Sequence, residues 1–220
     1  MARLSRIVVP DFPHHVMQRG VRSMTVFNND DDRRRYIALL AEQCQRFRVE
    51  ILAWCLMTNH VHFIATPHQE TALARAFGEA HRRYTRGKNL HDNTRGYLFQ
   101  GRFSSVVLDE RHLLAAARYV ELNPVRAAMI DLAWNYPWSS AAFHMGLRDD
   151  DPLVEDRSLL GLVTDWKEFL AGGDNRDTNS LRTATRTGRP VGDIVFFQRL
   201  AAITVKDIAP VRRGRPAKKK

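Results

Sequence analysis

Two histidines stand one residue apart in the segment NHVHF, residues 59–63. Alternate side chains of a β-strand point to the same face, so His60 and His62 would project side by side while Val61 and Phe63 enter the core. Two neighbouring imidazoles can supply half of a divalent metal site, but a metal needs further ligands. Taken alone, the same pair also fits a polar strand surface without any catalytic role.

The second reactive pattern is RYVELNP, residues 118–124. Tyr119 and Asn123 are four positions apart, so they share one face of a helix. The Tyr119 phenol can attack phosphorus when a metal polarises the phosphate, and the Asn123 amide oxygen can act as a third metal ligand. A structural interpretation stays open, with Tyr119 an ordinary half-buried tyrosine and Asn123 an N-cap whose next residue, Pro124, opens a new helix.

Periodicity predicts the elements that must position these residues. Strands are expected at residues 14–18, 49–57, 60–66 and 98–108, the last as a hairpin around Gly101. Helices are expected at residues 30–47, 71–85, 110–122 and 124–130. The order β-α-β-β-α-β predicts an α+β fold, with a ferredoxin-like split βαβ antiparallel sheet, helices on one face and a helical C-terminal extension.

Composition divides the chain into three parts. Residues 1–148 would form the domain that holds the two reactive patterns. Residues 149–210 would form the helical extension, with helices at 158–170 and 191–203 joined by a polar, flexible linker over 172–189. Residues 211–220 form a tail with six basic residues and no acidic one.

The chain carries 34 Lys and Arg against 24 Asp and Glu, a net charge of +10. Such an excess favours a polyanionic partner, usually nucleic acid, although it also serves plain solubility. Arg75, Arg82 and Arg86 share a face of the helix that begins at residue 71, and Arg102 follows nearby. Beside the reactive patterns, we interpret these four as a groove for a phosphate backbone rather than a solvated helix face.

The basic tail contains the sequence RGRP, with Arg213 and Arg215, followed by three lysines. This sequence resembles an AT-hook, which lies in the minor groove of A·T-rich duplex DNA. A nonspecific basic tail is an equally good interpretation. Both interpretations make Arg213 and Arg215 candidate DNA contacts.

We expect a cytoplasmic, nucleoid-associated protein without membrane contact. The sequence leaves its oligomeric state open between a monomer and a homodimer. The longest apolar run, residues 51–57, is too short to span a membrane, and the first residues lack the apolar region of a secretory signal. Cys44 and Cys55 are too few and too irregularly placed for a disulfide framework.

Five segments together resemble one family. NHVHFIA resembles the HUH motif, in which U is hydrophobic, and ARYVELNPVRAAMI resembles the tyrosine segment of the REP-associated tyrosine transposases. These belong to the single-tyrosine HUH transposases. HHVMQRGVRSMTVF, YLFQGRFSSVVLDE and NYPWSSAAFH extend the resemblance, in the family's order, over most of residues 10 to 145. The C-terminal zone matches loosely, chiefly through GRP sequences.

The resemblance implies a metal-dependent single-stranded DNA endonuclease and strand transferase. Tyr119 would be the nucleophile that forms a 5′-phosphotyrosine, and His60 and His62 would be metal ligands. Asn123 stands where related enzymes place a third polar ligand, commonly glutamine, so the shorter side chain departs from the pattern. The cofactor would be Mg²⁺ or Mn²⁺, with Mn²⁺ at least as effective beside two imidazoles. The substrates would be single strands and hairpins formed by REP-like palindromes.

Two other functions compete with this one. A non-catalytic, ferredoxin-like single-stranded nucleic-acid-binding protein would need stacking aromatic residues on the sheet face, where Trp54 is the one candidate. A metallohydrolase using the two histidines would need further His or Asp ligands, and the other histidines show no such spacing. The transposase-like enzyme therefore remains the favoured prediction.

Overall fold

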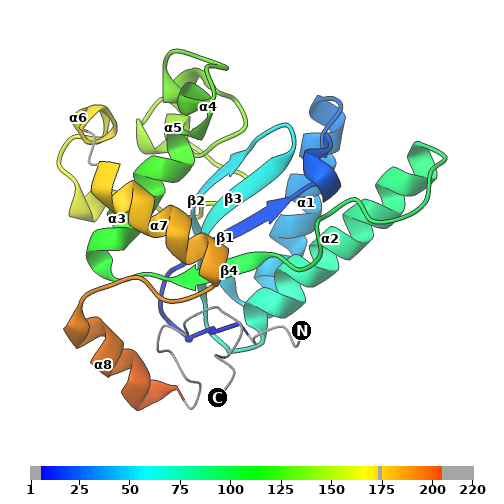
Figure 1. Cartoon of the computed structure of the whole chain (residues 1–220). Helices are drawn as coiled ribbons and strands as arrows, with labels where there is room; N and C mark the ends of the chain where they lie inside the picture. The colour runs from blue at the N-terminus through cyan, green and yellow to red at the C-terminus, as the bar shows by residue number, and fades with distance from the viewer. Residues whose placement is uncertain (1–5, 173–174, 205–220) are drawn as a thin grey trace, which may run out of the picture.

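The computed structural model describes residues 6–172 and 175–204 (Figure 1). The strands are β1 (His14–Arg19), β2 (Val49–Leu56), β3 (His60–Pro67) and β4 (Ser104–Val107). The α-helices are α1 (Asp30–Phe47), α2 (Ala72–His91), α3 (Glu110–Glu121), α4 (Asn123–Arg126), α5 (Ala141–His144), α6 (Trp166–Ala171), α7 (Asn175–Thr187) and α8 (Ile194–Ile203). The short 3-10 helices are η1 (Val21–Ser23), η2 (Ala133–Asn135) and η3 (Ser158–Leu162).

The four strands form one antiparallel sheet in the order β2-β3-β1-β4. β1 lies in the interior and pairs with β3 along its length, with Met17 opposite His62 and Arg19 opposite His60. The first elements follow the predicted order β-α-β-β-α-β, and the strand order is that of a ferredoxin-like sheet. The α+β fold is therefore confirmed.

One face of the sheet packs against α1 and α2. Val61, Phe63 and Ala65 of β3 are fully buried in this core, as the alternation of β3 predicts. The start of α1 is fixed by Asn29, whose side chain accepts a hydrogen bond from the backbone N–H of Asp32 at 2.9 Å. This N-cap satisfies one of the free N–H groups at the helix start.

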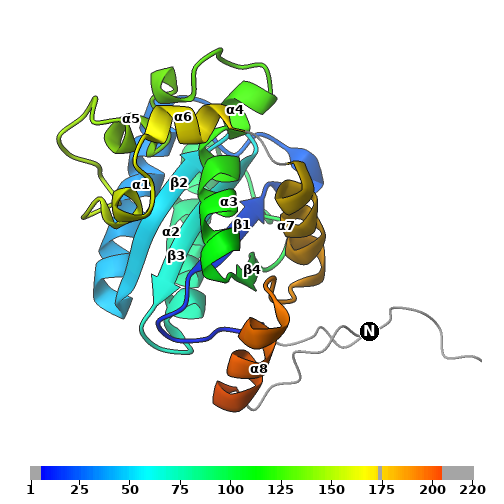
Figure 2. The same ribbon diagram turned by 90° about the vertical axis from the view of Figure 1, so that its left-hand side faces the viewer.

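The opposite face of the sheet is covered as well, by α3 and by α7 of the extension (Figure 2). The sequence predicted helices on one face, and α1 and α2 do lie together there. On the second face, Ala116 and Ala117 of α3 pack in one cluster with Ala53 and Ile64 of the sheet. These small side chains let α3 lie close above the histidine-bearing strand β3.

The predicted hairpin over residues 98–108 is wrong. Only Ser104–Val107 pairs with β1, and Phe99 makes an isolated bridge to Gly20. Gly101 has a φ of 73°, a left-handed conformation that turns the chain out of a strand. The segment instead runs back along α2, where Phe99 and Phe103 pack in the core under the helix.

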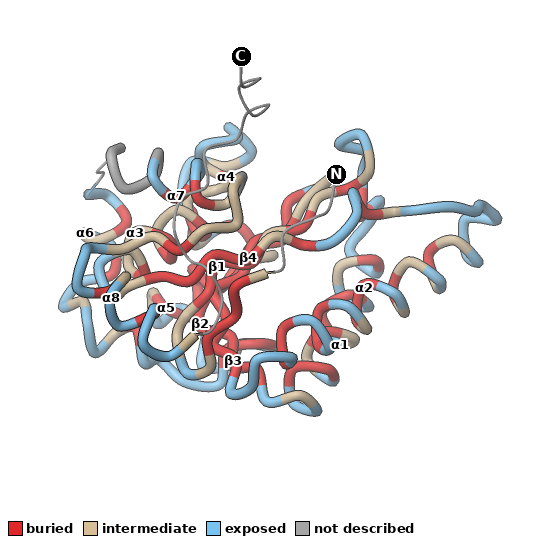
Figure 3. Tube along the Cα trace, turned by 60° about the horizontal axis from the view of Figure 1, so that its bottom comes forward, coloured by how far each residue is buried: buried red, intermediate tan, exposed pale blue. Residues whose placement is uncertain are grey.

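Helix α2 continues to His91, beyond the predicted end at Thr85. Its later turns are held by Lys88, which is buried and bonded to Asp32 and Asp92 at 2.9 Å each. The last turns and the following loop project from the body of the protein as an exposed arm (Figures 1 and 3). Helix α4 is shorter than predicted and ends at Arg126.

The extension departs from the prediction in its middle. The expected flexible linker over 172–189 contains α7, whose Leu181 and Ala184 are buried in the same cluster as α3. The expected single helix at 158–170 is split into η3 and α6. The predicted boundary after residue 148 does not separate two cores, because both sides contribute to this cluster. The basic tail, with Arg213 and Arg215, lies outside the described residues.

Both edges of the sheet are covered by later parts of the chain. On the β2 edge, Cys55 bridges Ser139, and the backbone N–H of Leu56 donates to the carbonyl of Trp138 at 2.9 Å. On the β4 edge, Leu108 bridges Val191. Covered edges are protected from pairing with other chains. Within residues 6–172 and 175–204, no helix has both the length and the apolar character needed to cross a membrane.

Acid should destabilise this fold through its buried histidines. Burial lowers the pKa of His14 to about 4 and that of His81 to about 3. Below pH 6.5 these histidines therefore bind protons in the unfolded chain but stay neutral in the folded one. The free energy of unfolding falls as the pH drops toward 4. Each such histidine should cost about 2 kcal/mol at pH 5.

Urea unfolding at pH 7.5 and pH 5 measures this loss. His14→Gln should reduce the difference between the two pH values, whereas His91→Gln, at an exposed position, should leave it unchanged. An equal pH dependence in both variants would show that His14 is not a source of the acid sensitivity.

Candidate active site

The structure brings His60, His62 and Tyr119 together. His60 and His62 lie on the same face of β3, with ring centroids 5.0 Å apart. The Tyr119 ring, from α3, meets the His62 ring edge-on with centroids 5.5 Å apart. The strand alternation and the helical spacing thus converge at the face of the sheet that α3 covers.

Asn123 joins this group rather than capping a helix. Helix α4 begins at Asn123 itself, its cap position is Leu122, and no side chain caps it. The N-cap interpretation of Asn123 is therefore wrong. The side chain of Asn123 instead hydrogen-bonds to His60, and its Nδ2 is buried with no partner among the described residues.

The imidazoles of the site are held neutral. Burial lowers the pKa of His60 to about 4, helped by the nearby Arg19 and opposed by the hydrogen bond to Asn123. Burial also places the pKa of His62 well below its ordinary value, with smaller contributions from His15, His60 and Arg19. Neutral imidazole is the form that binds a metal ion.

The hydrogen bonds around His60 suit a metal ligand. Its Nδ1 lies 2.6 Å from Asn59 Oδ1, which can accept a hydrogen bond from it. The hydrogen bond to Asn123 raises the His60 pKa, so the Asn123 side chain also acts as an acceptor toward this ring. Metal-binding imidazoles are usually oriented by such a bond from their other nitrogen. In the described parts of the chain, no group of three or more His, Cys, Asp or Glu side chains is placed so that it could hold a metal ion. The residues therefore fit Mn²⁺ or Mg²⁺ only as an incomplete set: two imidazoles and the Asn123 amide oxygen, with positions left for substrate.

The phenol of Tyr119 lines a basic cavity. The cavity has a volume of about 550 Å³, and its lining includes His15, His62 and the three arginines Arg19, Arg102 and Arg182. His60 and Asn123 are not part of this lining. Two guanidinium groups also lie over the Tyr119 ring, with Arg126 Cζ 5.0 Å and Arg182 Cζ 5.9 Å from its centroid. Concentrated positive charge beside the phenol favours the binding of a phosphate group.

Several of these residues were missed by the sequence analysis. His15 and Arg19 lie at alternate positions of β1, so the predicted strand offered a signal for their common face. Arg126 lies two residues beyond the reactive pattern and was a detectable candidate. Arg182 lies in the segment predicted to be a linker, where nothing in the sequence indicated a site.

The predicted DNA-binding arginines divide into two groups. Arg82, Arg86 and Arg102 line a second cavity of about 880 Å³ between α2 and the segment 94–103, which we call the basic groove. Gln18 and Arg102 line both the basic groove and the Tyr119 cavity, so the two adjoin. Arg75 does not line the basic groove, and its guanidinium packs over the Phe47 ring with Cζ 4.4 Å from the centroid.

The sequence matches the family model for IS200-like transposases over residues 9–123. The chain belongs to this family. The match spans His60, His62 and Tyr119 and ends at Asn123. IS200-like transposases move DNA by cutting and joining it, which agrees with a phenol set among arginines. The family resemblance seen in the sequence is confirmed.

Solved structures extend the comparison to the fold. The structure of a REP-associated tyrosine transposase bound to a REP hairpin matches with a TM-score of 0.58 and 14% identity, covering 72% of this chain and 94% of that chain. A putative transposase from Deinococcus radiodurans R1 is 18% identical over 55% of this chain and 96% of its own, but its TM-score of 0.36 is too low to support an argument. No curated protein matches significantly.

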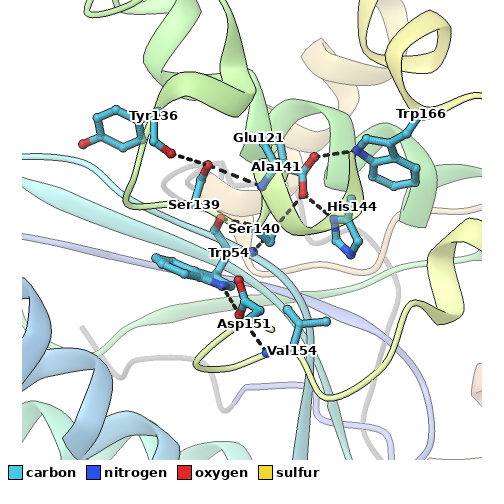
Figure 4. Close-up of polar contacts among 10 residues, drawn as sticks. All are labelled: Trp54, Glu121, Tyr136, Ser139, Ser140, Ala141, His144, Asp151, Val154 and Trp166. Atoms are coloured by element: carbon cyan, nitrogen blue, oxygen red, sulfur yellow. Dashed lines mark hydrogen bonds and ion pairs between the residues drawn. The ribbon is translucent and has the colours of Figure 1, made fainter. Parts of the chain in front are cut away.

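A buried carboxylate fixes the end of the helix that carries the transposase's Tyr119 (Figure 4). Glu121 Oε1 accepts hydrogen bonds from Ser140 Oγ at 2.6 Å and His144 Nδ1 at 2.5 Å. Glu121 Oε2 accepts one from Trp166 Nε1 at 2.8 Å. Ser140 also accepts from the backbone N–H of Trp54, which connects the cluster to β2. We call Glu121, Ser140, His144 and Trp166 the Glu121 cluster.

Removing one donor from the Glu121 cluster should destabilise the protein. Trp166→Phe keeps most of the ring packing but leaves Oε2 of a buried carboxylate unpaired, which should cost about 2 kcal/mol. The measurement is chemical unfolding of both proteins. Trp134→Phe is the matched control, since Trp134 is half-buried beside the same core and does not hydrogen-bond to Glu121. Equal effects of the two changes would contradict the role assigned to the Trp166 hydrogen bond.

Proposed function

We propose that this IS200-like transposase cuts and rejoins single-stranded DNA, with Tyr119 as nucleophile and with His60, His62 and Asn123 as ligands of a divalent metal ion. The observation that carries the proposal is the contact of the Tyr119 ring with His62 inside a cavity lined by three arginines. A nucleophile, a metal-competent imidazole and phosphate-binding groups thus share one cavity.

The chemistry follows from these groups. Tyr119 Oη forms a bond to phosphorus while the bond from phosphorus to the 3′-oxygen breaks. The phenol loses a proton and the departing 3′-hydroxyl gains one, so the step is balanced and leaves a 5′-phosphotyrosine. Because one phosphodiester replaces another, the reverse reaction rejoins DNA without ATP. A metal ion bound by His60, His62 and Asn123 would supply charge withdrawal from the scissile phosphate.

We propose that the arginines of the cavity bind the DNA phosphates and so position the strand beside Tyr119. Arg19, Arg102 and Arg182 line the same cavity as Tyr119, and their guanidinium groups suit the paired oxygens of a phosphate. The basic groove continues from Arg102 toward Arg82 and Arg86. We propose that the strand entering the cavity runs along this groove. The similar REP-associated enzyme is bound to a REP hairpin, which supports a hairpin substrate for this chain.

The binding-only alternative loses its main support. A single-stranded nucleic-acid-binding sheet stacks bases on exposed aromatic residues. Trp54, the candidate for that role, is 1% exposed and donates its Nε1–H to Asp151. Helices α3 and α7 also cover the sheet face on which bases would stack.

Tyr119→Phe should abolish the covalent protein–DNA adduct while leaving DNA binding within about twofold, because only the nucleophilic hydroxyl is lost. Denaturing electrophoresis of the protein with labelled single-stranded hairpin substrates measures the adduct. EDTA present from the start should prevent formation of the wild-type adduct, and excess Mn²⁺ should restore it. Tyr97→Phe is the control, since this 88% exposed tyrosine lines the basic groove and should keep the adduct. An adduct that persists in Tyr119→Phe would remove Tyr119 from the mechanism.

Arg86→Ala should weaken DNA binding and reduce its salt dependence, whereas Arg75→Ala should change both much less. Both arginines lie on α2, but only Arg86 lines the basic groove. Each lost phosphate contact should lower the log–log salt slope by about 0.7 on single-stranded DNA. Affinity titrations over a range of salt concentrations make the comparison. Equal losses in the two variants would place the DNA elsewhere on the surface.

A further inference from the structure

His15 lies between the proposed metal ligand His62 and the C-terminal extension. Its side chain is buried on β1, and its Nε2 is 2.9 Å from His62 Nδ1. Its Nδ1 is 3.1 Å from the hydroxyl of Thr185 on α7. A continuous hydrogen-bonded chain therefore connects the extension with the metal site.

Donors and acceptors in this chain can be assigned by elimination. A neutral imidazole donates from one nitrogen and accepts on the other. The Thr185 hydroxyl donates to the carbonyl of Leu181, one turn earlier in α7, at 2.8 Å. Its proton is thus engaged, so Thr185 Oγ1 can only accept from His15 Nδ1–H.

The same elimination continues to His62. Because Nδ1 of His15 carries the proton, His15 Nε2 is the acceptor and must receive its hydrogen bond from His62 Nδ1–H. His62 Nε2 is then left without a proton and carries a lone pair. This is the nitrogen that a metal ion can bind while the opposite nitrogen is held in place.

We propose that His15 and Thr185 are positioning residues that hold His62 as its Nδ1–H tautomer, so that α7 must be docked for full metal affinity. The inference rests on the proposed function, because it assigns His62 as a ligand. The rings of His15 and His62 are nearly parallel, 5° apart, and the hydrogen bond between them makes the tautomer of His62 depend on that of His15.

Without the Thr185 hydroxyl, the tautomers of His15 and His62 are no longer fixed. The N–H on His15 Nδ1 would then be buried without an acceptor, an unfavourable arrangement. If His15 moves its proton to Nε2, it becomes the donor toward His62 Nδ1, and His62 must hold its own proton on Nε2. The nitrogen assigned to the metal is blocked in that arrangement.

The test is the Thr185→Val variant of the full chain, which keeps the branched shape and removes the hydroxyl. Long-range ¹⁵N–¹H correlation spectra of histidine-labelled protein without metal report the tautomer of each ring. Wild type should show His62 as Nδ1–H, and Thr185→Val should add or substitute the Nε2–H form. Titration with Mn²⁺ alone should show affinity weakened about tenfold.

Two controls separate the hydroxyl from the packing of α7. Thr185→Ser should retain the wild-type tautomer and Mn²⁺ affinity. Thr183→Val, at an exposed position of the same helix, should behave as wild type. A fall in Mn²⁺ affinity that is equal in Thr183→Val and Thr185→Val would overturn the inference, since it would come from a general change in the helix.

The possible failures are distinguishable. His62 observed as the Nε2–H tautomer in wild type, or unchanged Mn²⁺ affinity in Thr185→Val, overturns the inference and leaves the Tyr119 chemistry intact. Wild-type protein that binds no Mn²⁺ overturns the inference together with the metal part of the proposed function. Loss of the DNA adduct is not used as the measurement, so failure of the Tyr119 assignment cannot be mistaken for failure of this one.

Discussion

The buried carboxylate of Glu121 is the constraint on which the rest of the structure depends. It is fully buried, and a carboxylate in that position is strongly destabilising unless hydrogen-bond donors surround it. Its donors come from the residues around α5 and from the start of α6. Those segments must therefore fold against α3. Since Glu121 is the last residue of α3 and Tyr119 is two residues before it, the bonds that satisfy the carboxylate also fix the helix end that carries the phenol.

The site is assembled from elements that lie far apart in the sequence. The central strands supply His15 and His62, α3 supplies Tyr119, and α7 supplies Arg182 and Thr185. The separation of phenol and imidazole depends on how closely α3 approaches the sheet. The small side chains on the inner side of α3 set that approach, because larger ones would lift the helix from the strands. The distance between the Tyr119 and His62 rings is thus set by the packing of α3 on the sheet rather than by a hydrogen bond between the two side chains.

The parts of the structure predicted from sequence are those governed by periodicity. The side-by-side placement of His60 and His62 follows from strand alternation, and the common face of Tyr119 and Asn123 follows from helical spacing. Helix α7 was missed because its stretch is polar. Among the α7 residues whose burial the structure describes, Leu181 and Ala184, three positions apart, are the buried ones. The polar composition of this stretch predicted a linker, but packing against α3 stabilises it as a helix. The pattern Asn-Pro suggested a cap at Asn123, but α3 and α4 follow each other so closely that Leu122 takes the cap position.

The extension packs into the same core as the helix that carries Tyr119. The family match ends at Asn123, yet Trp166, Leu170, Leu181 and Ala184 lie in the cluster that also holds Val120 of α3. The chain beyond residue 123 covers both outer strands, through Ser139 at β2 and Val191 next to β4. A fragment ending near residue 148 would expose apolar residues of α3 and leave Glu121 without its Trp166 donor. Strand β3 carries His60 and His62 and α3 carries Tyr119, and the extension provides the burial that holds these proposed site residues in one arrangement.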